Sequence, residues 1–332
     1  MIFAQDILAR LRAVIDPASS ILIIGHRSPD GDAVGSTLAL QHYFHSLGKR
    51  AEVLMPDGFP PFLNWLPGSE GIHLFDGDTE SGIERIRTAD LIFCLDFNRM
   101  DRVGPMSKHL IEASCPKVVI DHHLDPSAFD LMFSETTSSS TCELVYRLVE
   151  ALGDIESQTK EFFTCIYTGL LTDTGSFKYN VYPTTFRIAG HIVSKGIVPQ
   201  DIQSSLFDVN SLNRLQLLGT LLSERLLHFP EHRASLMTMT AEILQKYDYQ
   251  PGDTEGFVNY GLSLQDCTFT ALASEKDGVV KISFRSKGDV DVNVLANEAF
   301  GGGGHKNAAG ARTEKSLAEV EAIITDIIKT RL

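Results

Sequence analysis

Short apolar runs alternate with longer segments of helical periodicity over the first half of the chain. The apolar runs are typical of strands buried on both faces, and they lie at 20–25, 49–55, 89–96 and 117–123. Helices are predicted around them at 1–17, 32–47, 79–87, 104–113, 140–152 and 158–171. Strands and helices that alternate at this spacing predict βαβ units, and therefore an α/β domain with a doubly wound, mostly parallel sheet.

The second half of the chain has a different pattern. Three helices are predicted first, without an intervening strand, at 184–195, 199–208 and 211–227. Strands follow at 233–240, 267–274 and 279–285, and helices at 290–300 and 315–330. The dipeptide Asp277-Gly278 favours a hairpin between the last two strands. We therefore expect a first domain at 1–195, a helical connector at 196–228, and a smaller α/β domain with a mixed sheet at 229–332.

Residues that can bind metal ions follow three of the strands in the first half. They are His26, Asp30 and Asp32 after the first strand, Asp96 after the third, and Asp121, His122 and His123 after the fourth. Sites in parallel sheets form at the carboxyl ends of strands, near the point where the strand order reverses, so we expect these side chains to meet. Asp173, which stands between two threonines at the end of helix 158–171, is a further candidate.

The turn Pro29-Asp30-Gly31-Asp32 holds two carboxylates close together. At roughly 4 Å and an effective dielectric constant near 20, their repulsion is about 4 kcal/mol, which water or bound cations would relieve. A solvated turn beside an unrelated histidine is the alternative. The donors are too many for one tetrahedral ion and suit two divalent ions about 3.5–4 Å apart, between which a water is activated to attack phosphorus. Carboxylate-rich ligation favours Mn²⁺, with Mg²⁺ or Co²⁺ as alternatives.

A glycine run, Gly301–Gly304, lies in the second domain and is followed by His305 and Lys306. Glycines let the backbone approach a ligand closely, and successive N–H groups of such a segment can bind an anion. Arg285, His305 and Lys306 add positive charge to an acidic chain. We therefore predict that this segment binds phosphate, and a flexible linker is the alternative.

One further motif has a purely structural interpretation. The segment Ser140-Thr141-Cys142-Glu143 has the spacing of a capping box, in which a serine and a glutamate each bond the other's backbone N–H. We therefore expect these residues to begin helix 140–152 and to have no role in the site.

Composition places the chain among globular proteins, with 43% hydrophobic and 22% charged residues, and its 332 residues are enough for two domains. The net charge of −14 argues against long duplex nucleic acid or an anionic membrane as a partner, but bound divalent ions would still admit a short anionic substrate. The five cysteines form no CxxC pair, and neither a signal sequence nor an apolar run of membrane-spanning length is found. We expect a cytoplasmic protein, and a homodimer stays open.

The motifs taken together resemble a known family. They are GHRSPDGDAVGS at 25–36, the strand that ends in Asp96, DHH at 121–123, TDTGSF at 172–177 and GGGGHKNAAG at 301–310. In this order they resemble the DHH phosphoesterase superfamily with its C-terminal DHH-associated domain. Within that superfamily, the chain is most similar to the small oligoribonucleases, or nanoRNases, that also hydrolyse 3′-phosphoadenosine 5′-phosphate.

The resemblance implies a role for each matched residue. One ion would be held by His26, Asp30 and Asp96, and the second by Asp32, Asp96, His122 and Asp173, so that Asp96 bridges them. Asp121 would orient an imidazole, and His123 would face the phosphate as a hydrogen-bond donor or acid. The substrate would be bound by Arg285, Ser286, Gly302, Gly303, Gly304 and His305, with Arg102 as a further candidate. A solvated position at the start of a helix is the alternative for Arg102.

The resemblance also implies a Mn²⁺-dependent phosphoesterase that releases mononucleotides from short oligoribonucleotides and AMP from 3′-phosphoadenosine 5′-phosphate. A soluble cyclic or linear dinucleotide phosphodiesterase, and an exopolyphosphatase or pyrophosphatase-like hydrolase, are alternatives. RecJ-type exonucleases usually carry further domains, the membrane-bound cyclic-dinucleotide phosphodiesterases carry transmembrane segments, and family II pyrophosphatases lack the GGGH segment. A metal-dependent nucleotide-binding module without activity is a rival of another kind, against which the intact ligand set and His123 argue.

Overall fold

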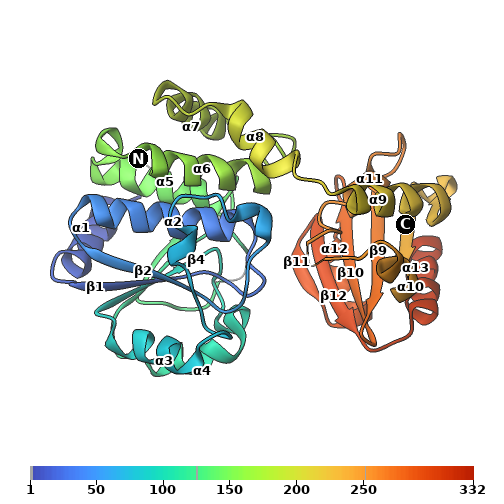
Figure 1. The fold of residues 1–332 in the computed structure, drawn as a ribbon, viewed down its shortest axis with the longest axis horizontal. Helices are drawn as coiled ribbons and strands as arrows, with labels where there is room; N and C mark the ends of the chain where they lie inside the picture. The colour runs from blue at the N-terminus through green and yellow to red at the C-terminus, as the bar shows by residue number, and fades with distance from the viewer. Residues whose placement is uncertain (1–2, 125, 251) are drawn as a thin grey trace. The chain divides into compact units, whose positions relative to one another are not determined.

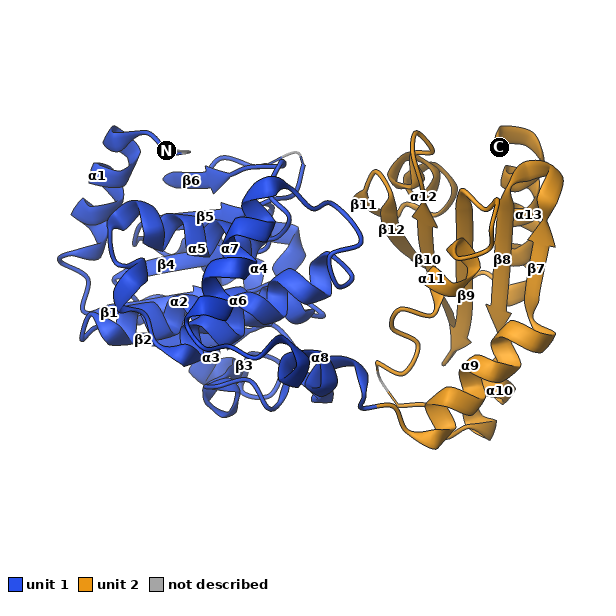
Figure 2. Cartoon of the chain, turned by 90° about the horizontal axis from the view of Figure 1, so that it is seen from above, with its two compact units in different colours: residues 1–209 blue, residues 210–332 orange. Residues whose placement is uncertain are grey.

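The computed structural model describes residues 3–124, 126–250 and 252–332. The chain divides into two compact units, unit 1 at 1–209 and unit 2 at 210–332, which Figure 2 shows in separate colours. Their boundary lies inside the segment 196–228 that the sequence predicts as a helical connector. The first two residues of the helix predicted at 1–17 lie outside the described residues.

Unit 1 is built on a six-stranded parallel sheet with the order β3-β2-β1-β4-β5-β6. Its strands are β1 Ser20–Ile24, β2 Arg50–Met55, β3 His73–Leu74, β4 Leu91–Leu95, β5 Lys117–Asp121 and β6 Leu131–Ser134. The chain runs outward from β1 to β3, returns to β4 and runs outward again to β6. The strand order therefore reverses between β1 and β4, and this is where parallel sheets form their sites.

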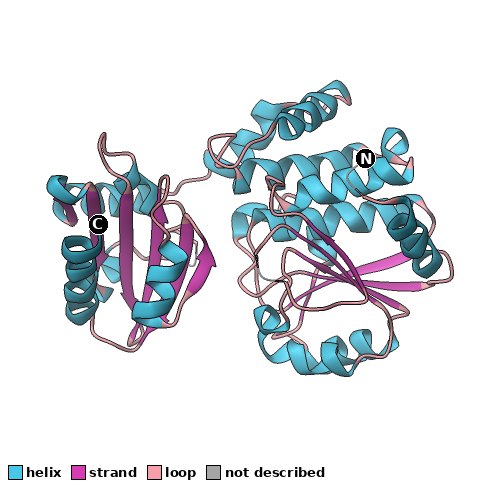
Figure 3. Ribbon diagram, turned by 180° about the vertical axis from the view of Figure 1, so that it is seen from behind, coloured by secondary structure: helices cyan, strands magenta, loops and turns pink. Residues whose placement is uncertain are grey.

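Helices cover both faces of this sheet (Figures 1 and 3). One face packs against α1 Gln5–Ile15, α2 Gly31–Ser46, α5 Thr141–Leu152 and α6 Lys160–Asp173, and the other against α3 Thr79–Thr88 and α4 Ser107–Glu112. Neighbouring residues of β1 alternate between the two cores: Ile23 is buried on the first face and Ile24 on the second. Two more helices, α7 Pro183–Ser194 and α8 Pro199–Phe207, contact α6. The predicted doubly wound α/β domain is confirmed.

Unit 2 contains a six-stranded mixed sheet with the order β11-β12-β10-β9-β8-β7, in which only the pair β8–β9 is parallel. The strands are β7 Leu226–Phe229, β8 Ala234–Met239, β9 Phe269–Lys276, β10 Val279–Ser286, β11 Gly303–His305 and β12 Ala308–Thr313. The helices are α9 Leu212–Glu224, α10 Ala241–Lys246, α11 Val258–Leu262, α12 Val292–Phe300 and α13 Leu317–Arg331. Within the described residues, neither unit has a helix that is both long and apolar enough to cross a membrane.

The structure corrects some of the predicted elements. The helix predicted at 211–227 ends at Glu224, and its last residues belong to β7. The short strands β3, β6, β7, β11 and β12 were not predicted, because two to six residues give too little periodicity and β11 consists mainly of glycine. The predicted hairpin at Asp277-Gly278 is confirmed, since both residues have the positive φ that a tight hairpin turn requires and β9 pairs antiparallel with β10.

Candidate metal centre

The turn between β1 and α2 supplies the first group of donors. His26 lies two residues beyond β1 and is buried. Asp30 is the N-cap of α2, and one of its carboxylate oxygens accepts hydrogen bonds from the N–H groups of Asp32 and Ala33 at 3.0 and 3.1 Å. This cap places Asp32, which is 1% exposed, in the first turn of the helix.

Asp96 follows β4 directly and has a left-handed backbone, with φ of 63°. Aspartate adopts this conformation more readily than most residues, but it still carries strain, and strain of this kind gathers at functional sites. The N–H of Asp96 donates to the carbonyl of Ile120 on β5 at 3.1 Å, which fixes the turn. The carboxylate, which is 2% exposed, lies with Oδ2 3.3 Å from Nε2 of His26.

The end of β5 contributes two imidazoles in different surroundings. Nε2 of His122 lies 3.7 Å from Asp96, 3.9 Å from Asp32 and 3.5 Å from Asp173. Nδ1 of His123 lies 3.8 Å from Asp96 and 2.7 Å from one oxygen of Asp121, which is fully buried. The other oxygen of Asp121 accepts the backbone N–H of His123 at 2.9 Å. Asp121 thus fixes the orientation of the His123 ring.

The structure brings together most of the predicted ligands. Among the described residues of unit 1, three groups have donor atoms within 4.8 Å of one another: a first of His26, Asp30 and Asp96, a second of Asp32, Asp96 and His122, and a third of Asp96, Asp121 and His123. Asp173, the last residue of α6, approaches the second group through His122. Asp96 belongs to all three groups. The members of each group come from separate segments of the sequence, and only folding brings the ends of β1, β4 and β5 side by side.

The charges of this centre perturb one another. Burial disfavours a charged imidazole, but the hydrogen bond to Asp96 and the negative charges of Asp30 and Asp96 outweigh it and raise the pKa of His26 to about 9. Burial likewise opposes the rise in the pKa of His122, which Asp96 and Asp32 produce. Burial, together with the charges of Asp96 and Asp173, raises the pKa of Asp32. A buried excess of carboxylates therefore attracts positive charge, whether protons or cations.

The beginning of α5 is a part of this centre that the sequence analysis missed. The N–H groups of Thr141 and Cys142 donate to the two oxygens of Asp32 at 2.7 and 2.9 Å, and the Thr141 hydroxyl donates to Asp96 at 2.9 Å. Ser140 caps the helix as predicted, but the reciprocal half of the capping box is not formed, because the carboxylate of Glu143 accepts hydrogen bonds from the hydroxyls of Ser139 and Thr185. The expectation that residues 140–143 only begin the helix did not include these contacts, because only the fold places this helix end against two carboxylates more than forty residues away in the chain.

The predicted substrate-binding residues of unit 2 surround its edge hairpin. Arg285 and Ser286 end β10, where Arg285 pairs with Ala308 of β12 and donates to the carbonyl of Phe284 at 2.9 Å. The buried hydroxyl of Ser286 donates to the carbonyl of Val290 and accepts from Asn307.

The glycine run is an ordered strand rather than a linker. Gly303, Gly304 and His305 form β11, which pairs with β12. A Cβ on Gly302 or Gly304 would collide with the neighbouring strand, which explains why these positions need glycine. The N–H of Gly304 donates to the side chain of Asn293 at 2.8 Å. Phosphate binding by this segment stays a prediction.

Arg102 lies in unit 1, in the 3₁₀ helix η3 at Met100–Met106 that follows Asp96. It is exposed, its carbonyl accepts the N–H of Arg27 at 2.8 Å, and its positive charge acts on His26. Both interpretations of Arg102 are consistent with this position.

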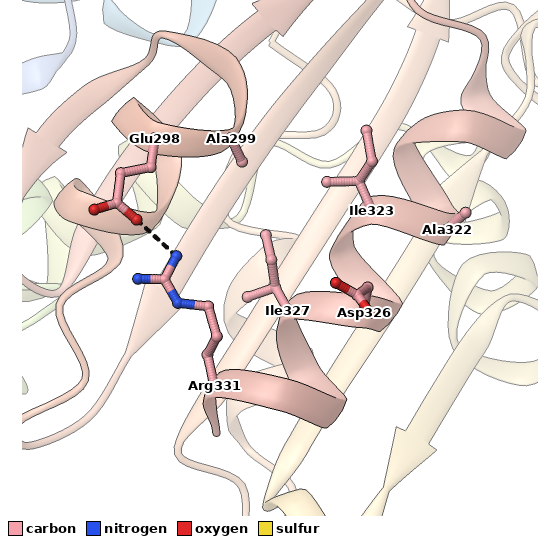
Figure 4. A pocket seen from close by; sticks show the side chains of 7 residues that line it. All are labelled: Glu298, Ala299, Ala322, Ile323, Asp326, Ile327 and Arg331. Carbon is pink, nitrogen blue, oxygen red and sulfur yellow. Dashed lines mark hydrogen bonds and ion pairs between the residues drawn. The ribbon is translucent and has the colours of Figure 1, made fainter.

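An open pocket between α12 and α13 of unit 2 is lined by Glu298, Ala299, Ala322, Ile323, Asp326, Ile327 and Arg331 (Figure 4). An ion pair between Arg331 and Glu298 at 2.7 Å spans it. None of the predicted site residues lines this pocket.

The donor set of unit 1 fits a pair of divalent cations. Oxygen donors dominate, imidazoles complete each group, and a carboxylate is shared between the groups. The ligands are held by further contacts: Asp121 fixes the ring of His123, and the carbonyl of Ser138 lies 3.3 Å from Nδ1 of His122. Such surrounding hydrogen bonds are typical of metal centres in proteins.

Both units match known protein families. Residues 20–170 match the DHH family, N-terminal domain, and residues 236–330 match the DHHA1 domain. The chain is 38% identical to an exopolyphosphatase-related protein from Bacteroides fragilis, with a TM-score of 0.95 and coverage of 98% of this chain and 96% of that one.

Relatives of two kinds are found among characterised proteins. The bifunctional oligoribonuclease and PAP phosphatase NrnA of Thermus thermophilus is 29% identical over 91% of this chain and 85% of its own. The cyclic-di-AMP phosphodiesterase PdeA of Listeria monocytogenes is 25% identical over 96% of this chain. This chain spans only about half the length of PdeA, 48%.

Proposed function

The chain belongs to the DHH family and is a hydrolase of phosphoester bonds, and on this premise we propose that it hydrolyses short oligoribonucleotides to mononucleotides and 3′-phosphoadenosine 5′-phosphate to AMP. The relative NrnA of Thermus thermophilus, which matches over most of both chains, carries both activities in its name. The single observation on which the proposal depends is the shared carboxylate of Asp96, which lies between two groups of cation donors.

The proposed metal ligands of unit 1 form two cation positions. His26, Asp30 and Asp96 would hold one divalent ion, and Asp32, Asp96, His122 and Asp173 the other, with Mn²⁺ as the proposed metal. When bound, such a pair supplies an activated water and neutralises the negative charge that develops on the oxygens around phosphorus. The buried carboxylates keep their oxygens in place, so that little reorganisation is needed during the reaction.

His123 is the proposed proton donor. Its Nδ1 is engaged by Asp121, which fixes the ring, and we propose that Nε2 donates to a phosphate or leaving oxygen. Asp121 has no exposed surface, and both of its oxygens serve His123. Asp121 therefore acts through His123 and does not itself meet the substrate.

Unit 2 supplies the residues that we propose bind the substrate. Arg285 offers a planar cation that suits the oxygens of a phosphate group. Gly302, Gly303 and Gly304 leave a strand edge without side chains, against which a nucleotide can lie closely, and His305 ends that edge. Ser286 supports the hairpin through Asn307.

Incubation of the purified protein with Mn²⁺ and a panel of substrates tests this function. The panel comprises a diribonucleotide, 3′-phosphoadenosine 5′-phosphate, pyrophosphate and a cyclic dinucleotide. Release of mononucleotides from the diribonucleotide and of AMP from 3′-phosphoadenosine 5′-phosphate is expected. Turnover of pyrophosphate alone would contradict the proposal.

Cyclic-dinucleotide hydrolysis is the second candidate, and the similarity to PdeA over 96% of this chain favours it. The chemistry at phosphorus is the same, so the metal centre does not separate the two activities. The ratio of kcat/KM for the linear and the cyclic dinucleotide separates them. We expect the linear substrate to be preferred.

A further inference from the structure

The beginning of α5 makes contacts with the metal centre that a helix cap does not require. The cap itself is Ser140, whose hydroxyl accepts the N–H of Glu143 at 3.0 Å. The next two N–H groups, of Thr141 and Cys142, are donors that every helix leaves without a partner inside the helix. Here they donate to the two oxygens of Asp32, one each.

The Thr141 hydroxyl extends this arrangement to the second carboxylate. It donates to Oδ1 of Asp96 at 2.9 Å, and Thr141 is fully buried. Oδ1 is also the oxygen of Asp96 that lies 3.7 Å from His122, whereas Oδ2 lies 3.3 Å from His26. Thr141 therefore contacts the oxygen through which Asp96 approaches His122, in the group formed by Asp32, Asp96 and His122.

Each of these hydrogen bonds leaves lone pairs on the carboxylate. A carboxylate oxygen has two lone pairs, and the three donors of α5 use one on each of three oxygens. The remaining lone pairs are held in fixed directions, because the donors belong to one helix end. Asp32 belongs to α2 and Asp96 follows β4, so this helix end fixes two carboxylates from different elements relative to one another.

The helix end is itself held from behind by Glu143, which has no exposed surface. Its carboxylate accepts hydrogen bonds from the hydroxyls of Ser139 at 2.7 Å and Thr185 of α7 at 2.6 Å. Arg147, one turn further along α5, lies 3.2 Å from its other oxygen. A buried carboxylate satisfied in this way ties α5 to α7 and restricts movement of Thr141.

We propose that Thr141 is a positioning residue, which aims the shared carboxylate of Asp96 and, with the N–H of Cys142, the carboxylate of Asp32 toward the second cation. The inference deepens the proposed function and rests on it, since it concerns the same pair of cations. Its consequence is selective: loss of the hydroxyl should weaken the second cation position and leave the one around His26 intact. Thr141 is fully buried, so we expect no contact with the substrate and an unchanged KM.

The test is Mn²⁺ binding to the full, metal-free chain, measured by titration calorimetry and by the EPR signal of the unbound ion. Thr141→Val keeps the shape of the side chain and removes the hydroxyl, and Thr141→Ser keeps the hydroxyl. Thr37→Val is the matched control, because Thr37 is equally buried in α2 but its hydroxyl donates to the carbonyl of Ala33 at 2.8 Å. Thermal unfolding in EDTA checks the fold of each variant, and Thr141→Ala replaces Thr141→Val if the latter does not fold.

The wild type is expected to bind two Mn²⁺. In Thr141→Val the affinity for one of them should fall about 10- to 100-fold, while Thr141→Ser and Thr37→Val bind both as the wild type does. The kcat for a diribonucleotide at limiting Mn²⁺ should fall with unchanged KM. Unchanged binding of both ions by Thr141→Val, or an equal loss in Thr37→Val, would overturn the positioning role.

Failure of the proposed function gives a different result. A wild type that binds two Mn²⁺ but releases no mononucleotides contradicts the activity, and the binding comparison of Thr141→Val with Thr37→Val still decides the positioning role. A wild type that binds fewer than two ions overturns both.

Discussion

Asp96 contacts both halves of the candidate metal centre at the scale of single residues. Its two oxygens face different histidines, His26 through Oδ2 and His122 through Oδ1. Burial opposes ionisation, but the hydrogen bond from His26 and the nearby imidazoles hold the pKa of Asp96 below its usual range. The lowered pKa favours the carboxylate form, which a bridge between cations requires.

Asp96→Asn should abolish hydrolysis with every divalent metal. The amide has the same shape but no charge. Removing one partner of a buried charge pair costs about 3–5 kcal/mol, and a loss of that size in transition-state stabilisation corresponds to about 10²- to 10⁴-fold in kcat/KM. The measurements are kcat/KM on a diribonucleotide and the number of Mn²⁺ bound. Asp90→Asn is the control, because Asp90 precedes the same strand at its other end and accepts hydrogen bonds from Ser19. Near-normal activity of Asp96→Asn would refute a shared ligand.

The pair of His26 and Asp96 should make the metal-free protein less stable at high pH. The pKa of His26 is about 9 in the folded chain against 6.5 in the unfolded one. A raised folded pKa contributes stability that is complete below pH 6.5 and is lost as the pH rises through about 9. In EDTA, the stability difference between wild type and His26→Asn should therefore shrink over this window, by at most about 3 kcal/mol. A difference that grows with pH would contradict the assignment.

Arg285→Ala should mainly raise KM. A charge-assisted hydrogen bond to phosphate contributes about 1.5–3 kcal/mol, which corresponds to about 10- to 100-fold in KM if the contact is present before the reaction. Steady-state kinetics on a diribonucleotide measure KM and kcat. Arg312→Ala on the neighbouring strand β12 is the control, since Arg312 is an exposed cation of the same sheet. A fall in kcat at unchanged KM would place the contact in the transition state instead.

Close packing of helices shapes the site at the scale of elements. The helices α2, α5 and α6 approach one another where glycines leave room: Gly35 lies beside the backbone of α6, and Gly169 lies beside Cys142 and Asp32. The carboxylate of Asp32 consequently sits between two helix N-termini, that of α2 to which it belongs and that of α5. The positive ends of both helix dipoles favour its charge.

Gly169→Ala should disturb the site through packing alone. The new Cβ would lie 2.7 Å from Oδ1 of Asp32 and against the sulfur of Cys142. We expect a loss of about 1–3 kcal/mol in unfolding free energy and weaker Mn²⁺ binding, measured by denaturant unfolding and calorimetry. Gly190→Ala in α7 is the matched control. Apart from its chain neighbours and the backbone of its own helix, no atom of the described residues lies within 4 Å of the new Cβ, so the unfolding free energy should rise by up to about 1 kcal/mol. Equal effects of the two substitutions would contradict the packing argument.

At the scale of the whole molecule, each unit has its own sheet and its own cores. The cores of unit 1 lie on the two faces of the parallel sheet, and those of unit 2 on the two faces of the mixed sheet. All proposed metal ligands lie in unit 1, and the proposed substrate-binding residues other than Arg102 lie in unit 2. Metal binding and the stability of unit 2 should therefore be separable.

Mn²⁺ should raise one of two thermal transitions. A ligand that binds only the folded form stabilises the unit that contains its site, so scanning calorimetry should show the transition of unit 1 moving upward with Mn²⁺. Phe284→Ala removes a fully buried side chain from unit 2 and should reduce the unfolding free energy of that unit by about 3–5 kcal/mol. The transition whose temperature falls in this variant is then that of unit 2. A single transition that moves as a whole in both experiments would show that the units unfold together.

Much of this organisation follows from local signals in the sequence. The runs of apolar residues predicted β1, β2, β4 and β5, and the polar residues after them predicted which loops carry the donors, because strand ends in a parallel sheet share one edge. The hairpin at Asp277-Gly278 required only the turn preference of two residues. Such features depend on neighbours along the chain, so the sequence by itself determined them.

Other features depend on contacts between distant segments. The strand order, the pairing of short strands such as β6 and β11, and the left-handed backbone of Asp96 arise only when the sheets assemble. The role of Thr141 is the clearest case, since its motif is that of an ordinary helix cap and its partners, Asp32 and Asp96, lie on other elements. Only the tertiary structure decided where that helix end points, because its unpaired donors have no preferred partner until packing brings a carboxylate within hydrogen-bond distance.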